Sequence, residues 1–212
     1  ASIKSFYLKP QQGALPAFKG GQFLPVKVEI DGVEHKRTYS LSSAPDDEHY
    51  RISVKKDGLV STYLHQQLKS GSELQVKRPN GGFTIPSDRP LVMLAAGVGV
   101  TPFVSILRQA RIERTKLRNR QPMTLFFQIR NKASRPFFNE LNELVGNQSD
   151  GLRVIWSMSQ PENGLQLGKD YHYQGRIDRA LLQAALPLDD YDFMLCGPGE
   201  FMQQQYDMLI EL

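Results

Sequence analysis

Short apolar runs separated by turn residues fill the first 85 positions of the chain. The segments rich in β-branched and aromatic residues predict strands at residues 3–8, 22–30, 36–41, 50–55 and 73–77. Asp31-Gly32 between two of these runs is a hairpin signal, and residues 61–68 have the spacing of a short helix. Short strands with a single inserted helix predict a small antiparallel barrel or sandwich.

The pattern changes after residue 88. Near-continuous apolar runs predict buried strands at residues 91–96, 122–129, 152–158 and 192–195. Helical segments alternate with them at residues 103–113, 137–145, 178–185 and 200–212. This alternation predicts an open, mostly parallel α/β sheet, so we expect two domains, residues 1–88 and 89–212.

The composition narrows the class of protein. The 212 residues are 40% hydrophobic and 23% charged, which is typical of a globular chain. The single cysteine, Cys196, excludes an internal disulfide and a metal site built from several cysteines. It is compatible with a reducing cytoplasm, where we expect the protein to reside. No apolar stretch approaches the roughly 20 residues that span a bilayer, so we expect no membrane span.

A glycine loop, Gly97-Val98-Gly99-Val100-Thr101-Pro102, follows the strand at 91–96 and opens a helix. Glycines in this place let the backbone approach a ligand, and the first helical N–H groups favour phosphate. Thr101 suits the N-cap and Pro102 the first helical position. The loop departs from the dinucleotide pattern G-x-G-x-x-G because Pro102 replaces the third glycine, so a tight turn without a ligand is the alternative.

A second loop, Cys196-Gly197-Pro198-Gly199, also lies between an apolar strand and a helix. The carboxyl ends of parallel strands meet at one edge of a sheet, so both loops are predicted to face the same ligand. By itself, Cys196 is better explained as a small buried residue.

The first half contains the run Arg37-Thr38-Tyr39-Ser40 on a predicted strand. Strand alternation places Arg37 and Tyr39 on one face and Thr38 and Ser40 on the other. A flat ligand could therefore lie on Tyr39 while Arg37 binds its phosphate. The alternative is an ordinary strand, since Tyr, Thr and Ser are common in strands.

The turn after residue 55 is a second candidate for phosphate binding. Gly58, the free backbone N–H groups beside Val60, and the Ser61 hydroxyl open a short helix, with Lys55 nearby in the sequence.

These segments together with Gly81-Gly82-Phe83, in this order and spacing, resemble the ferredoxin–NADP reductase superfamily. The chain is most similar to the reductase portion of flavohemoglobins and of FAD reductases fused to a plant-type ferredoxin domain. The resemblance covers essentially the whole chain. It implies an antiparallel FAD-binding barrel followed by a Rossmann-like parallel-sheet domain for the nicotinamide nucleotide.

The resemblance also implies a role for each matching position. The FAD site would comprise Arg37 and Ser61 on the pyrophosphate, Gly58 and Val60 through their backbone, Tyr39 on the isoalloxazine, Ser40 near its N5, and Thr38 and Lys55 beside the flavin. The nucleotide site would comprise Gly97, Gly99, Val100, Thr101 and Pro102 in one loop and Cys196, Gly197 and Pro198 beside the nicotinamide. Ser40 and Cys196 would lie at the reacting rings and are the candidate catalytic residues.

The implied activity is transfer of hydride from NADPH or NADH to FAD, followed by electron transfer to a ferredoxin-type, heme or other one-electron acceptor, separate or fused. Direct hydride transfer needs no strong acid or base. This fits a sequence whose four histidines show no triad or metal spacing. An FMN-containing reductase of the phthalate dioxygenase reductase type and a non-catalytic nucleotide-binding module are the alternatives. We expect a monomer.

Two departures limit the resemblance. Family members continue past the last helix into a further strand with an acidic residue near the flavin, and no residue here matches it, so we expect that final strand to be absent. The loop Arg130-Asn131-Lys132 is basic, and both cations would favour the 2′-phosphate of NADPH. NADH remains open if both cations are simply solvated.

The net charge is +4, and basic residues cluster at Arg108, Arg111, Arg114, Lys116, Arg118 and Arg120. At about 1.5 Å per residue, this run lies on the order of 15 to 20 Å along the helix from the phosphate loop. We expect it to complement the helix C-terminus and to be solvated. The charge therefore predicts no nucleic-acid binding and gives no evidence for an acidic partner.

Overall fold

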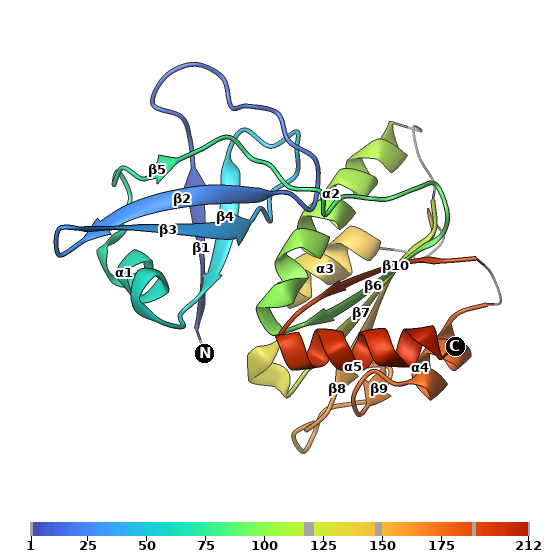
Figure 1. The fold of residues 1–212 in the computed structure, drawn as a ribbon. Coiled ribbons are helices and arrows are strands. Elements are labelled where there is room, and N and C mark those ends of the chain that lie inside the picture. The colour runs from blue at the N-terminus through green and yellow to red at the C-terminus, as the bar shows by residue number, and fades with distance from the viewer. Residues whose placement is uncertain (1, 117–120, 147–149, 188–189, 212) are drawn as a thin grey trace.

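The computed structural model describes residues 2–116, 121–146, 150–187 and 190–211. A barrel formed by the first part of the chain lies beside an α/β sandwich formed by the second part, and the long helix α2 runs between them (Figure 1). Within the described residues, no helix combines the length and the apolarity that a bilayer crossing requires.

The barrel contains two antiparallel sheets around one core. Its elements are β1 (Ile3–Leu8), β2 (Phe23–Ile30), β3 (Val33–Ser40), β4 (Tyr50–Lys55), α1 (Leu59–Gln67) and β5 (Gln75–Val76). β1 pairs with β4, the second sheet has the order β3-β2-β5, and an isolated bridge from Leu41 to Ile52 connects the two sheets. The predicted antiparallel barrel is confirmed.

Alternation along β2 shows why this sheet has one buried face. Leu24, Val26 and Val28 point into the core, while Lys27 and Glu29 are exposed. β3 begins earlier than predicted, because the tight Asp31-Gly32 turn lets pairing with β2 start next to the turn. β5 is shorter than predicted, since only its two residues pair with β2.

The second part contains a five-stranded sheet of order β10-β6-β7-β8-β9, parallel throughout. Its elements are β6 (Leu91–Ala96), η1 (Gly97–Val100), α2 (Thr101–Thr115), β7 (Met123–Ile129), η2 (Lys132–Ser134), α3 (Phe138–Val145), β8 (Leu152–Met158), β9 (Tyr173–Gln174), α4 (Arg179–Ala185), β10 (Asp192–Cys196) and α5 (Gly199–Ile210). The predicted parallel α/β sheet is confirmed. β9, η1 and η2 were not predicted because two to four residues are too short to show a period.

Helices cover both faces of this sheet. α2 and α3 contribute Phe103, Leu107 and Leu141 to the core on one face, and α4 and α5 contribute Leu182 and Phe201 to the core on the other. All six residues of β6 are buried, because this strand lies inside the sheet and is covered on both sides. The continuous apolar run in its sequence follows from that position.

The end of the barrel packs on the second part. Phe83 and Ile85 lie against the sheet core, and the ring of Phe83 contacts that of Phe103 on α2 with centroids 5.6 Å apart. The two parts are therefore joined by apolar packing as well as by the chain.

The basic run on α2 is only partly solvated, so the prediction of a solvated run was wrong, whereas Arg114 complements the helix C-terminus as predicted. Arg114 is 6% exposed, and its guanidinium donates to backbone carbonyls, including that of Ala110 near the helix end. Arg111 pairs with Asp150, and Lys116 pairs with Asp46 of the barrel. These contacts arise because α2 lies between the barrel and the sheet, so its basic side meets carboxylates from both. Arg118 and Arg120 lie outside the described residues.

Candidate functional site

Two glycine loops meet at the carboxyl ends of neighbouring parallel strands. β10 pairs with β6, and Cys196 lies opposite Ala95 in the register. Gly99 approaches the other loop so closely that an added Cβ would lie 2.3 Å from the Cys196 carbonyl oxygen and 2.6 Å from the Gly197 nitrogen. The prediction that these two loops lie together is confirmed, and only glycine fits at residue 99.

The first loop forms η1 before α2 begins. Gly97 is exposed with φ of +57°, and an added Cβ there would have no atom within 4 Å. Gly99 and Val100 are buried beneath it. The loop is therefore packed on one side and open at Gly97, which leaves backbone accessible to a ligand on the open side.

The start of α2 differs from the prediction at one residue. Thr101 is not the N-cap: its hydroxyl donates to the Val98 carbonyl at 3.0 Å, and Val100 occupies the cap position. The reason is the preceding 3-10 turn, which already follows a helical path. Pro102 is the second residue of α2 and not the first as predicted, and it still lies in the first turn, where proline is tolerated. The other first-turn N–H groups and the helix dipole favour an anion.

The second loop presents a neutral thiol. Burial raises the pKa of the Cys196 thiol above its ordinary value, so it stays protonated at neutral pH. A Cβ added at Gly197 would lie 2.7 Å from a ring carbon of Phe201, so the glycine packs closely against this ring. The next residue, Pro198, is exposed and precedes α5. A protonated, half-buried thiol can border an aromatic ring but is a poor base or nucleophile.

The turn before α1 is built by local contacts. Gly58 has φ of +97° and ψ of −178°, a conformation that glycine alone adopts readily. The Ser61 hydroxyl accepts from the Asp57 N–H at 2.8 Å and donates to the Gly58 carbonyl at 3.1 Å. Lys55 pairs with Asp57 at 3.0 Å, and the Val60 side chain is buried in the barrel core. Val60 can therefore meet a ligand only through its backbone.

Strand β3 shows the predicted alternation. Tyr39 and Arg37 lie opposite the inward-facing Leu24 and Val26 of β2, whereas Thr38 lies opposite Pro25. Tyr39 packs partly on the barrel core, and this burial raises its pKa although the charge of Arg37 opposes the rise.

Ser40 and Arg37 on β3 differ in their exposure. Ser40 is half-buried at the end of the strand. The exposed Arg37 guanidinium donates to the Lys36 carbonyl at 2.7 Å, so donors remain for a phosphate.

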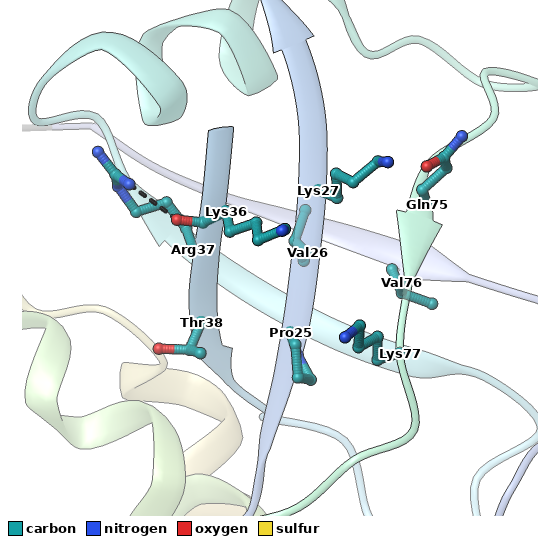
Figure 2. A pocket seen from close by; sticks show the side chains of 9 residues that line it. All are labelled: Pro25, Val26, Lys27, Lys36, Arg37, Thr38, Gln75, Val76 and Lys77. Carbon is teal, nitrogen blue, oxygen red and sulfur yellow. Dashed lines mark hydrogen bonds between the residues drawn. The ribbon is translucent and has the colours of Figure 1, made fainter. Parts of the chain in front are cut away.

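A groove of about 470 Å³ lies along the sheet β3-β2-β5. The residues that line it are Pro25, Val26, Lys27, Lys36, Arg37, Thr38, Gln75, Val76 and Lys77. Figure 2 shows Arg37 and Lys36 extending from β3 in opposite directions, with Lys36 toward strand β2. The groove contains neither of the glycine loops.

A hydrogen bond connects the two candidate half-sites. The Ser105 hydroxyl on α2 donates to the Ser43 carbonyl at 2.7 Å, and both residues are buried. Ser43 follows Ser40 by three residues, and Ser105 follows Thr101 by four. The end of the Arg37–Ser40 run is thereby held against the helix that the first glycine loop opens.

A hollow of about 370 Å³ lies at the carboxyl ends of β7 and β8. Its lining residues are Gln128, Ile129, Arg130, Ser159, Gln160 and Arg176. The Arg130 Nε donates to the Gln160 Oε1 at 2.8 Å, so this predicted residue is at the hollow. Lys132 is not among the lining residues, and its backbone N–H donates to the Glu162 carboxylate at 3.0 Å. No sequence pattern points to Arg176, which follows the short strand β9 and reaches the hollow because β9 pairs with β8.

These features fit two dinucleotides. The barrel offers helix N–H groups at the start of α1, and strand β3 offers the exposed Arg37 guanidinium beside the half-buried Tyr39 ring in the sequence. The paired glycine loops offer a second anion site at the edge of a parallel sheet, with a hollow lined by two arginines at the neighbouring strand ends. The residues present therefore suit FAD on the barrel and a nicotinamide nucleotide on the sheet.

Comparison with known families decides the class. Residues 2–85 match the oxidoreductase FAD-binding domain, and residues 93–207 match the oxidoreductase NAD-binding domain. The chain belongs to the ferredoxin–NADP reductase superfamily. The resemblance stated from the sequence is therefore confirmed, and so are FAD and NAD(P) as the cofactors of this superfamily member.

The relatives of this reductase agree with the assignment. It is 34% identical over 215 residues to the flavohemoprotein of Bacillus subtilis, and the aligned region covers 99% of this chain and 52% of that protein. It is 31% identical to the FAD/NAD-binding domain of nitric oxide dioxygenase from Vibrio cholerae, with a TM-score of 0.84 and coverage of 100% and 87%. The flavohemoglobin of Malassezia yamatoensis, solved with bound FAD and heme, shares the fold at 24% identity and a TM-score of 0.82, with coverage of 99% and 52%. The chain spans about half the length of the curated relative.

Proposed function

We propose that this FAD- and NAD-binding oxidoreductase module takes hydride from NADPH or NADH and passes the electrons one at a time to a heme domain. The observation that carries the proposal is the joining of the two half-sites: the strand with Arg37–Ser40 is bonded through Ser43 to the helix that follows the paired glycine loops. The heme acceptor rests on the flavohemoprotein relatives, and a ferredoxin-type acceptor is the alternative.

The residues of the barrel would hold and orient the flavin. Arg37 would neutralise the pyrophosphate together with the backbone N–H groups at Gly58 to Ser61. Tyr39 would support the ring, and Ser40 would supply a hydroxyl beside it. When bound, the flavin supplies a site that accepts a hydride and releases electrons singly. Since no proton need be taken from carbon by the protein, the chain's task is alignment and exclusion of water.

The residues of the sheet would hold the nicotinamide nucleotide. The open backbone at Gly97 and the start of α2 at Thr101 would bind its phosphates, with Val100 and Pro102 shaping the turn. The neutral Cys196 thiol, with Gly197 and Pro198, would border the nicotinamide. Arg130 and Arg176 at the hollow would favour NADPH, because two guanidiniums suit a 2′-phosphate. Lys132 would contribute its charge from outside the hollow.

Two substitutions test this division of roles. Ser40→Ala should slow the anaerobic reduction of bound flavin by about tenfold or more while flavin content stays normal, because it removes a group at the reacting ring. Arg37→Ala should weaken FAD binding by about 10- to 100-fold, since a hydrogen bond to a charged group contributes about 1.5 to 3 kcal/mol. Stopped-flow absorbance and the flavin content of purified protein measure both. Normal reduction and normal content in both variants would contradict the roles.

The nucleotide preference has its own test. Arg176→Ala and Arg130→Ala should each lower kcat/KM for NADPH by about tenfold or more and leave that for NADH within about twofold. Lys169→Ala, an exposed lysine outside the hollow, is the control. Equal losses with both nucleotides would refute a contact with the 2′-phosphate.

A further inference from the structure

One buried arginine of the FAD-binding domain reaches into the NAD-binding domain. Arg51 on β4 is 7% exposed, yet its guanidinium donates to both carboxylate oxygens of Glu140 on α3, at 2.9 and 2.8 Å. Its Nε donates to the Ser42 hydroxyl at 3.1 Å, and its charged end lies over the ring of Phe137 at 5.3 Å. Two parallel N–H···O bonds fix direction as well as distance.

The Glu140 carboxylate also binds a second arginine, Arg108, which is paired with a carboxylate of the first domain. Glu140 accepts from Arg108 on α2 at 3.0 Å, and Arg108 binds both carboxylate oxygens of Asp47 in the FAD-binding domain, at 3.0 and 2.8 Å. Asp47 also accepts from the Ala44 N–H at 2.8 Å. Arg51, Glu140, Arg108 and Asp47, which we call the bridging ion cluster, thus cross between the domains twice and carry no net charge.

Three members of the bridging ion cluster are connected to a candidate cofactor segment. Arg51 binds Ser42, two residues after Ser40. Arg108 is on α2, the helix that Thr101 opens, and Glu140 is on α3, which follows the Arg130 loop. A shift of either domain would therefore have to break charge-assisted bonds that are largely screened from water.

We propose that the bridging ion cluster is a positioning device for hydride transfer, with Glu140 as its central positioning residue. The inference rests on the proposed function, in which one hydride, a proton with two electrons, leaves the nicotinamide C4 for the flavin, so that the nucleotide is oxidised and the flavin is reduced by two electrons. The cluster touches neither ring. It holds the nucleotide domain at the angle and separation that bring the donor carbon to the flavin.

The sensitivity of the reaction explains why such a device matters. A misplacement of about 1 Å can slow a reaction that depends on near contact by about 100-fold. Apolar packing such as that of Phe83 on Phe103 joins the domains without fixing their angle, since it has no directional bonds. The bidentate Arg51–Glu140 contact supplies that direction, and Arg108 adds bonds to Glu140 and to Asp47.

Glu140→Gln is the decisive variant because it keeps the shape and removes the charge. We expect the limiting rate constant of flavin reduction, per bound flavin, to fall by about 10- to 100-fold. FAD content should stay normal, and the Kd of the nucleotide should change by less than about threefold. Stopped-flow reduction with NAD(P)H and with its 4-deuterated form gives the rate and shows, through the isotope effect, that hydride transfer is the step measured.

Asp150→Asn is the matched control. It breaks the Arg111–Asp150 ion pair, whose side chains are 42% and 26% exposed. Both residues of this pair belong to the NAD-binding domain, so the pair does not connect the two domains. This variant should keep the wild-type rate. A purely structural cluster would lower the Tm of Glu140→Gln and leave the rate per bound flavin unchanged, and that result would overturn the proposal.

A second variant decides the question if Glu140→Gln does not fold. Asp47→Asn leaves the Arg51–Glu140 pair intact and loosens only the outer end of the cluster, so a smaller slowing, of about three- to tenfold, is expected. An unchanged rate in Asp47→Asn would overturn the proposal in that case. If wild-type protein with bound FAD is reduced by neither NADPH nor NADH, the proposed function fails instead.

Discussion

The two helix starts proposed to bind phosphate are built in different ways. At α1, the turn is closed by residues within four positions of each other: Ser61 bonds to Asp57 and Gly58. At α2, the turn is closed from a distance, because the space beside Gly99 is filled by the Cys196–Gly197 peptide from the other end of the domain.

This difference separates two uses of glycine. Gly58 is needed for its backbone conformation, with φ of +97° and no atom within 4 Å of an added Cβ. Gly99 has no positive φ but has no room for a side chain. Substitution by alanine should therefore strain the backbone at one site and push two loops apart at the other.

Gly99→Ala should have the largest effect. Its Cβ would lie 2.3 to 2.6 Å from backbone atoms of the second loop, which cannot move aside as a flexible side chain can. We expect a loss of stability of about 3 kcal/mol and a fall in Tm of several degrees. The Kd for NAD(P)H should rise by at least about tenfold while FAD content is kept.

Gly199→Ala is its control, since an added Cβ there meets nothing within 4 Å. Calorimetry and nucleotide titration measure both variants. A wild-type Tm and Kd for Gly99→Ala would show that the close approach of the loops is dispensable.

Gly58→Ala should have an intermediate effect, and it should weaken the binding of FAD instead of the nucleotide. Only backbone strain is introduced, which costs about 2 kcal/mol for a conformation largely reserved for glycine. FAD affinity should fall by about tenfold while nucleotide affinity is unchanged. Gly82→Ala, in the same domain and with open space beside it, should leave FAD affinity at the wild-type value. Equal losses of FAD and nucleotide affinity would contradict the independence of the two sites.

The thiol of the second loop should give the smallest effect. Because burial raises the pKa of Cys196, less thiolate is present in the folded chain than in the unfolded chain at a given alkaline pH. Iodoacetamide should therefore react more slowly with native protein than with protein unfolded in urea, at the same pH. The raised pKa also means that rising pH ionises the unfolded state first, so this thiol favours the folded state less as pH passes its ordinary pKa. Faster alkylation of the native protein would refute the shift.

Much of the fold followed from the sequence where a period was long enough to detect. The buried runs at 91–96 and 152–158 became strands of a parallel sheet, and the punctuated first half became an antiparallel barrel. Short elements escaped detection: two residues of β9 show no period, although their pairing with β8 brings Arg176 to the hollow. The assignment of individual site residues stays a prediction.

The basic run on α2 shows how a local interpretation fails. Arg108 and Arg114 stand in a charge-rich segment, which is typical of a solvated helix face. In the structure, Arg108 binds Asp47 and Glu140. Asp47 lies 61 residues before Arg108 and Glu140 lies 32 residues after it, so no local pattern predicts these contacts. Partners of charged residues depend on the packing of whole domains.

The sequence by itself determined the two domains' classes and the residues with suitable chemistry, because strand and helix periods and turn residues act over a few positions. Tertiary structure decided which of these residues meet. The contact of Gly99 with Cys196 and the ion pair of Arg51 with Glu140 each join segments about 90 or more residues apart. Such contacts form only when sheets and helices bury their apolar faces together, and no local pattern encodes them.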